Sequence, residues 1–179
     1  MERKIIISGL GGQGVVFLTR LLTKTAVSLG HSALVSESHG MSRRGGAVIS
    51  HLRIGGSEAP LIRRGTADML LALKTSEAIS NLDFLRRGGT AFVNSENGLP
   101  PKLMAQLEKL DITVHCLPAS QMALDLGAVA VTNVIMAGFA HPFPLQTMRE
   151  AIVALASRRA DLNLQALEAG FKESNHAAL

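Results

Sequence analysis

The order of segments at the start of the chain constrains the fold more than any other feature of the sequence. Residues 5–7 are isoleucines that run into a glycine cluster at residues 9–14, as a buried strand does when it enters a turn. Residues 15–29 then place apolar side chains at helical spacing, with Gly30 as the C-terminal cap. Residues 32–37 predict a second strand. This order predicts a βαβ unit, whose strands are parallel and whose crossover is right-handed.

The rest of the sequence alternates between strand and helix patterns until its last third, which is helical. We predict further strands at residues 47–54, 67–73, 90–94 and 112–117. We predict helices at residues 75–87, 101–110, 120–126, 129–140, 145–158 and 163–172. We expect a short hairpin arm at residues 59–62, which Pro60 confines to a sheet edge. These elements predict one α/β domain over residues 1–179, with three α/β/α layers, a mostly parallel Rossmann-like sheet and a helical C-terminal third.

The composition indicates that this chain packs against other chains. Hydrophobic residues make up 47% of the 179 residues and the mean hydropathy is +0.26, which supplies more apolar surface than a single core needs. We therefore expect a subunit, and self-association of the lone chain as a homodimer. No apolar run reaches the roughly 18 residues that cross a bilayer, and the start lacks the features of a signal peptide. These observations predict a cytoplasmic protein with no membrane partner.

Several functions are disfavoured by residue types that are rare or missing. Cys116 is the only cysteine, so the chain forms no internal disulfide and cannot alone supply the thiolates of an iron–sulfur cluster. The net charge is +4, but Trp and Tyr are absent, which leaves few platforms for stacking bases and argues against nucleic acid. No nucleophile motif, zinc-ligand pattern or Walker A sequence occurs. We therefore predict neither a catalytic residue nor a metal site in this chain.

The first candidate site is the glycine loop after the first strand. Gly9, Gly11 and Gly14 match the spacing G-x-G-x-x-G between a strand and a helix. Glu37 ends the next strand, 23 residues past Gly14. Missing side chains allow backbone N–H groups and the positive end of the helix to approach a phosphate, while a carboxylate can accept from a ribose hydroxyl. The candidate ligand contacts are therefore these glycines, Gly12 between them, and Glu37.

Three interpretations of this loop remain open. It can bind a dinucleotide, with Glu37 on the ribose. It can be a tight turn that lets the helix pack on the sheet and binds nothing. It can also contact the phosphates or nucleotide part of coenzyme A, or a cofactor held mainly by a neighbouring subunit. Gln13 stands where many dinucleotide loops have a small or apolar residue, and its amide is able to bond a ligand or another chain.

The second candidate site is a basic, glycine-rich segment at the carboxyl end of the second strand. It contains His39, Arg43, Arg44, Gly45 and Gly46. Ligands of parallel α/β sheets bind at that edge, and guanidinium groups recognise phosphates and carboxylates with paired hydrogen bonds. This pattern suits coenzyme A, the carboxylate of a 2-oxoacid or an acidic patch of a partner. A solvated basic loop, or salt bridges at an interface, also explains the same residues.

The histidines near this segment are not assigned a catalytic role. His39 has no carboxylate or nucleophile at a diagnostic spacing, so we do not predict it as a general base. His51 and Arg53 share one face of the strand predicted at residues 47–54, and we expect them to extend the polar surface of the segment.

The two candidate sites, in this order and near this spacing, resemble those of the gamma subunit of 2-oxoacid:ferredoxin oxidoreductases, most closely the small (beta) subunit of indolepyruvate ferredoxin oxidoreductase. The resemblance covers most of the chain. Residues 67–73 look like the family's strand before a helix with an early glutamate, here Glu77, and residues 163–170 resemble its C-terminal helix. Residues 39–41 and 44–46 look like the indolepyruvate branch, whereas the pyruvate branch has a Pro-Glu-x-Arg-Gly-Gly version.

The resemblance implies a fold, a reaction and partners. The fold is expected to be the gamma-type domain of the pyruvate and ketoisovalerate oxidoreductases. The whole enzyme is expected to convert an aryl pyruvate and coenzyme A to an arylacetyl-coenzyme A, carbon dioxide and reduced ferredoxin. Thiamine diphosphate and the iron–sulfur clusters are expected in a large partner subunit, since the family's thiamine-binding Gly-Asp-Gly block is absent here. This chain is expected to bind no cofactor alone, with coenzyme A as a co-substrate of the complex.

The resemblance therefore predicts a chain that is inactive alone. It is expected to scaffold the complex and to shape part of the coenzyme A or active-site entrance through residues 11–14 and 43–46. A free-standing NAD-binding Rossmann domain is the rival prediction, and a binding module with no ligand is a third. The sequence does not distinguish the oxidoreductase subunit from the binding module with no ligand, nor does it identify the 2-oxoacid.

Overall fold

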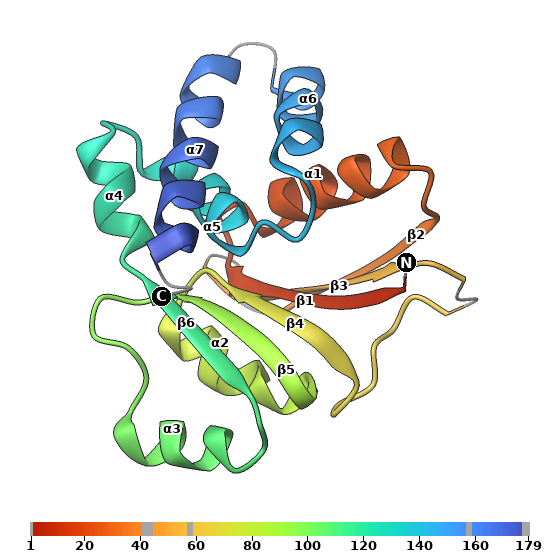
Figure 1. Cartoon of the computed structure of the whole chain (residues 1–179), viewed down its shortest axis with the longest axis vertical. Helices are drawn as coiled ribbons and strands as arrows, with labels where there is room; N and C mark the ends of the chain where they lie inside the picture. Colours follow the sequence, from red (N-terminus) through yellow and green to blue (C-terminus); the bar gives the residue numbers. More distant parts are fainter. Residues whose placement is uncertain (1, 41–44, 57–58, 157–158, 177–179) are drawn as a thin grey trace.

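Six strands form one mixed sheet at the centre of the molecule (Figure 1). The computed structural model describes residues 2–40, 45–56, 59–156 and 159–176. The strands are β1 (Arg3–Leu10), β2 (Ala33–His39), β3 (Ala47–Ile54), β4 (Ala67–Ala72), β5 (Leu85–Asn94) and β6 (Thr113–Leu117). Their order is β2-β3-β1-β4-β5-β6. Because β1, β4, β5 and β6 are parallel neighbours, their carboxyl ends meet at one edge, called the carboxyl edge below.

Helices cover both faces of the sheet. They are α1 (Val15–Ser28), α2 (Thr75–Asn81), α3 (Pro101–Glu108), α4 (Ala119–Asp125), α5 (Thr132–Ala140), α6 (Leu145–Leu155) and α7 (Ala160–His176). Helix α1 and the helices from α4 to α7 lie on one face, and α2 and α3 lie on the other (Figure 1). The predicted three-layer α/β/α fold and its helical C-terminal third are confirmed.

Strand β3 changes the topology expected for the start of the chain. Strands β1 and β2 point in the same direction, as predicted, but β3 lies between them and pairs antiparallel with both. The chain returns as a hairpin after β2, and the N–H of Gly40 donates to the C=O of Ala47 at 2.7 Å. A short connection favours this neighbouring antiparallel strand. The βαβ unit is therefore split by an inserted strand, which was not predicted.

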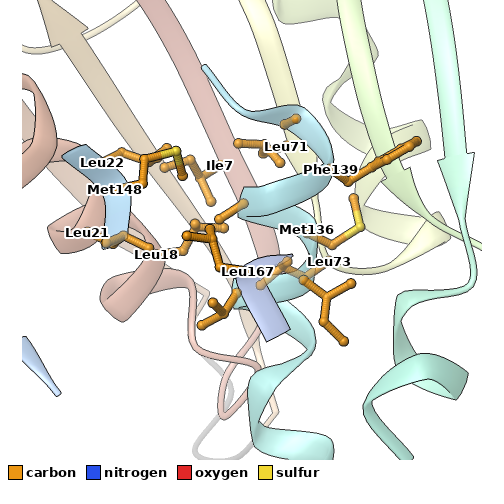
Figure 2. Packing of buried hydrophobic residues seen from close by; sticks show 14 of the residues in the cluster. Ile7, Leu18, Leu21, Leu22, Leu71, Leu73, Met136, Phe139, Met148 and Leu167 are labelled. Atoms are coloured by element: carbon orange, nitrogen blue, oxygen red, sulfur yellow. The ribbon is translucent and has the colours of Figure 1, made fainter. Parts of the chain in front are cut away.

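The larger of two apolar cores lies between the sheet and the helices α1, α5, α6 and α7 (Figure 2). Figure 2 shows Ile7, Leu71 and Leu73 on the side of the sheet. Facing them are the helical residues Leu18, Leu21, Leu22, Met136, Phe139, Met148 and Leu167. The second core lies on the other face and contains Ile6 and Leu70. Since neighbouring residues of β1 and β4 face opposite layers, both strands have an unbroken apolar run, at residues 5–7 of β1 and 69–72 of β4.

Helices α5 and α7 cross with their backbones in close approach. All nine residues of α5 are buried, which accounts for the long apolar run of the sequence there. A Cβ built on Gly138 would overlap the carbonyl oxygen of Leu167, and a Cβ built on Gly170 would overlap the carbonyl oxygen of Ile135. Each glycine therefore faces a carbonyl of the other helix, and no larger residue fits either position.

Two predicted elements differ from the structure. The helix predicted at residues 75–87 stops at Asn81, and β5 starts at Leu85 after one 3-10 turn. The strand begins this early because its parallel pairing with β4 reaches back to Ala67. Residues 59–62, predicted as a hairpin arm, form no strand. In the described part of the chain, no helix is both long and apolar enough to cross a membrane.

Candidate functional site

The glycine loop connects β1 to α1 at the carboxyl edge. Gly9 is the second-last residue of β1, and Gly14 precedes α1 with a φ of 83°. Gly12 also has a positive φ, of 93°. The N–H of Gln13 donates to the C=O of Leu10 at 3.0 Å and closes the turn. The predicted order of strand, glycine loop and helix is therefore present.

Two of the loop glycines are explained by packing inside the chain. A Cβ built on Gly9 would lie 2.9 Å from Cγ2 of Val15. A Cβ built on Gly14 would overlap the side-chain amide of Asn133, which donates to the C=O of Gly14 at 3.0 Å. The tight-turn interpretation accounts for these two glycines without a ligand. A Cβ built on Gly12 would instead meet nothing within 4 Å, so this residue faces open space.

The second glycine-rich segment meets the glycine loop. The N–H of Gly11 donates to the C=O of Gly46 at 2.9 Å. A Cβ built on Gly11 would lie 3.6 Å from the backbone nitrogen of Gly45. The two candidate sites, separate in the sequence, therefore form one continuous backbone surface. Arg43 and Arg44, the predicted cations of this segment, lie outside the described residues.

Glu37 and His39 are not brought to that surface. Both lie on β2, which β3 separates from β1. Glu37 is level with Ile7 and not with the loop, because it pairs with Ser50, which in turn pairs with Ile7. Nε2 of His39 lies 4.0 Å from Oε2 of Glu37. A dinucleotide site of the predicted kind needs its carboxylate on the strand beside the loop, and the inserted strand removes Glu37 from that place.

Gln13 occupies the crevice between β1 and β4. The sheet grows in opposite directions from this point, since β4, β5 and β6 lie on one side of β1 and β3 and β2 lie on the other. Its Oε1 accepts the N–H of Leu10 at 2.7 Å, and its Nε2 donates to the C=O of Leu73 at 3.3 Å. The same carbonyl of Leu73 accepts from Nδ2 of Asn94 at 3.0 Å. Asn94 also exchanges two hydrogen bonds with Ser120. A chain of hydrogen bonds therefore crosses the carboxyl edge, and the Gln13 amide bonds this chain's own backbone.

A polar cavity of about 470 Å³ opens beside these hydrogen bonds, at the ends of β4 and β5. Besides Gln13, its walls include Lys74, Thr75, Asn94, Ser95, Glu96 and Ser120. Sequence reasoning selected only Gln13 from this group. The signal it missed is that polar residues gather where two buried strands end, at 74–76 and 94–97. The carboxyl ends of neighbouring parallel strands meet, so these residues had to gather at one place.

The prediction that His51 extends the polar surface of the second glycine-rich segment is wrong. The residue is 6% exposed, its Nδ1 accepts the N–H of Ile62 at 3.2 Å, and its ring packs edge-to-face with that of Phe84. Burial lowers the pKa of His51, which favours the neutral ring that this hydrogen bond requires. Arg53 likewise donates to a carbonyl of the connection between β3 and β4. Both side chains hold that connection to the sheet and add nothing to the carboxyl edge.

Burial also governs the two titratable groups of β6. It raises the pKa of the Cys116 thiol, so the thiolate that a nucleophile needs is disfavoured. It lowers the pKa of His115, whose ring stacks on Phe92 with 5.2 Å between the centroids.

Comparison with known proteins decides the family. The profile described as Pyruvate ferredoxin/flavodoxin oxidoreductase matches residues 4–173. The chain belongs to this family. The chain is also 33% identical over 193 residues to the indolepyruvate oxidoreductase subunit IorB of Archaeoglobus fulgidus, with 97% of this chain and 96% of the relative covered. The family predicted from the two glycine segments is therefore confirmed.

Two solved structures share the fold of this oxidoreductase subunit. The gamma subunit of a keto/oxoacid ferredoxin oxidoreductase from Geobacter sulfurreducens PCA has a TM-score of 0.77 at 24% identity, covering 97% of this chain and 99% of that one. A 2-oxoglutarate:ferredoxin oxidoreductase from Magnetococcus marinus, solved with 2-oxoglutarate, coenzyme A and succinyl-CoA bound, has a TM-score of 0.80 at 16% identity. That match covers 98% of this chain and 31% of the other. The fold is there one part of a longer polypeptide.

Proposed function

We propose that this chain is the small subunit of an indolepyruvate ferredoxin oxidoreductase and that its carboxyl edge forms part of the entrance for coenzyme A. The complex decarboxylates an aryl pyruvate oxidatively, transfers the acyl group to coenzyme A and passes the electrons to ferredoxin. The large partner subunit supplies thiamine diphosphate and the iron–sulfur clusters. This chain scaffolds the assembly and contributes binding surface, without a catalytic residue of its own.

Membership of the family and end-to-end similarity to an indolepyruvate oxidoreductase subunit support the first half of the proposal. Exposed apolar side chains support a large partner. Leu124 and Val129, at the end of α4 and just beyond it, are 55% and 59% exposed. Large apolar side chains that gather on a surface are typical of protein interfaces.

The contact between the two glycine segments supports the second half of the proposal, a coenzyme A entrance at the carboxyl edge. The hydrogen bond from Gly11 to Gly46 places two glycine-rich segments together at the carboxyl edge, and Gly12 leaves the loop open to solvent. Exposed backbone at a helix N-terminus accepts phosphates readily. The adjoining cavity is polar and has the exposed cation Lys74 in its wall. Coenzyme A, which carries phosphates, suits this combination of backbone, cation and open space.

The arrangement does not favour a free-standing NAD-binding domain. Gln13 fills the crevice between β1 and β4 with its own hydrogen bonds, and Glu37 lies two strands away from β1. We expect no binding of NADH to the pure chain at millimolar concentration, measured by calorimetry. Tight binding that is lost in Glu37→Ala would restore the rival function.

The proposal is tested by expressing the chain anaerobically with a tag and identifying what purifies with it. A large subunit with iron–sulfur clusters and thiamine diphosphate should be recovered, and the complex should reduce ferredoxin only when both indolepyruvate and coenzyme A are present. The pure chain should show no turnover. A chain recovered alone, or a complex that ignores 2-oxoacids, contradicts the proposal.

The coenzyme A entrance is tested separately in the assembled complex with Lys74→Ala. Loss of a phosphate-binding cation should raise the KM for coenzyme A about tenfold and leave the KM for the 2-oxoacid unchanged. The matched control is Lys102→Ala, since Lys102 is also exposed but lies on α3, across the sheet. Equal effects of both variants, or none, would remove this edge from the coenzyme A path.

A further inference from the structure

Strand β2 ends the sheet with an unpaired edge. Its pairing with β3 is fixed by two flanking hydrogen bonds, from Gly40 to Ala47 and from Gly55 to Ser32. Hydrogen-bonded pairs alternate along an antiparallel ladder, so the even-numbered residues of β2 face β3 with their backbone groups. The N–H and C=O groups of its odd-numbered residues point outward. In the described ranges no further strand pairs with this edge.

An apolar groove runs beside the same edge. It lies between β2 and α1, and Leu155 at the end of α6 also lines it. Its apolar side chains are well exposed: Val27 is 54%, Val35 is 38% and Leu155 is 40% exposed. Val35 has both its side chain in this groove and its backbone groups at the open edge. A strand edge with exposed apolar residues next to it is a template for pairing with another chain.

We propose that β2 of one copy pairs antiparallel with β2 of a second copy, joining two sheets into one across a two-fold axis near Val35. The axis of such a pair is perpendicular to the sheet, so both α1 helices lie on the same face and their grooves cover each other. Residues Val27, Val35 and Leu155 of the two copies are then shielded from water. This contact is a property of the chain itself and does not depend on its substrate.

The charges at the groove favour a second copy of this chain as the occupant. Arg20 and Lys24 line it from α1, and Glu37 lines it from β2. Pairing about Val35 places Glu37 of one copy level with Ala33 of the other. Helix α1 ends at Ser28, five residues before β2 begins at Ala33, so its C-terminal half, which holds Lys24, lies toward the Ala33 end of β2. Each carboxylate therefore approaches a cation of the other copy, a self-complementary pattern of the kind a two-fold interface requires.

The first test measures association of the pure chain by sedimentation equilibrium. The wild type should dimerise, and Val35→Lys should raise the dimer Kd by about tenfold or more, because it adds a charge to the groove and the edge. The control Leu124→Lys changes an apolar residue on α4 that is still more exposed than Val35, and this variant should dimerise normally. A wild type that stays monomeric at its highest soluble concentration overturns the inference. So does a dimer that Val35→Lys leaves intact.

A charge exchange tests the two-fold pairing itself. Lys24→Glu and Glu37→Lys should each weaken the dimer, since each brings like charges together across the axis. The double variant should recover most of the loss. A double variant weaker than both single variants would show that these residues do not meet between copies.

Amide hydrogen exchange tests the strand pairing without any substitution. The amides of Leu34 and Ser36 face β3 and should be protected at every concentration. Those of Val35 and Glu37 should become protected only when the chain dimerises. Dimerisation without this alternating change would place the contact elsewhere. Protection that appears only on adding the large subunit would assign the edge to that partner and not to a second copy.

Discussion

Two groups of glycines in this molecule are needed for different structural reasons. At the crossing of α5 and α7, Gly138 and Gly170 stand where a carbonyl of the other helix occupies the space that a Cβ would need. At the carboxyl edge, Gly12 and Gly45 have positive φ angles of 93° and 67°, and a Cβ built on either would meet nothing within 4 Å. The first pair permits close packing, whereas the second permits an unusual backbone conformation beside open space.

The difference between the groups separates stability from function. A glycine whose Cβ position is filled by the chain itself is needed for the fold, whatever the protein binds. A glycine with open space around it is needed only for its backbone angles and for what approaches from outside. Gly14 stands between the two groups, since it has a positive φ of 83° and the amide of Asn133 where a Cβ would be.

The largest effect is expected for Gly138→Ala. The new Cβ would overlap the carbonyl oxygen of Leu167, so α5 and α7 must separate along a fully buried contact. We expect a loss of about 3 kcal/mol or more in the free energy of unfolding, at the upper end of overpacking effects, measured by urea denaturation. Gly56→Ala is the control, because a Cβ there meets nothing within 4 Å, and it should change stability by less than about 0.5 kcal/mol. Similar losses in both variants would refute the packing role.

A smaller effect is expected for Gly14→Ala, where strain and overlap combine. We expect a loss of about 2 kcal/mol, part of it from the positive φ and part from contact with Asn133. Asn133→Ala alone should also destabilise the chain, since it removes the hydrogen bond to the C=O of Gly14. The double variant should lose less than the sum of the single losses, because the second change creates room for the first. Strictly additive losses would show that the two residues do not interact.

The smallest effect on stability is expected for Gly12→Ala, which adds strain without overlap. We expect a loss of about 1 kcal/mol, and less for Gly12→Asn, because asparagine tolerates positive φ better than alanine. In the assembled enzyme the same variants should raise the KM for coenzyme A if the loop lies in its path. A loss as large as that of Gly138→Ala would show that Gly12 is needed for close packing, as Gly138 is, and would contradict the distinction between the two groups.

Local patterns predicted much of this fold. The isoleucines of β1, the glycine loop, the span of β3 and the helical last third are correct because each depends on periodicity within one segment. The end of α2 is different. Residues 82–87 carry enough apolar side chains to continue a helix, but residues 82–84 form a 3-10 turn and pairing of Leu85 with Ala67 on β4 makes residues 85–87 part of a strand. The place of β3 between β1 and β2 depends in the same way on contacts between distant segments.

The candidate site was predicted less completely than the fold. The contact of Gly11 with Gly46 follows the expectation that both segments lie at one edge. Glu37 was chosen on the assumption that β2 is the neighbour of β1, and the inserted β3 invalidates that choice. Asn94 and Ser120 have no motif of their own. They belong to the edge only because parallel strands bring the ends of β5 and β6 beside Gln13.

The order in which strands and helices are synthesised also determines which apolar surface of the nascent chain is exposed during translation. Strand β4 is laid down beside β1, and β5 and β6 are then each laid down beside the strand made before them, so the growing polypeptide can extend its sheet as it emerges. The helices that complete the larger apolar face come last, in α5, α6 and α7. At synthesis rates of about 5–20 residues per second, that face stays partly uncovered for seconds, with Leu71 and Leu73 open to chaperones or to other nascent chains.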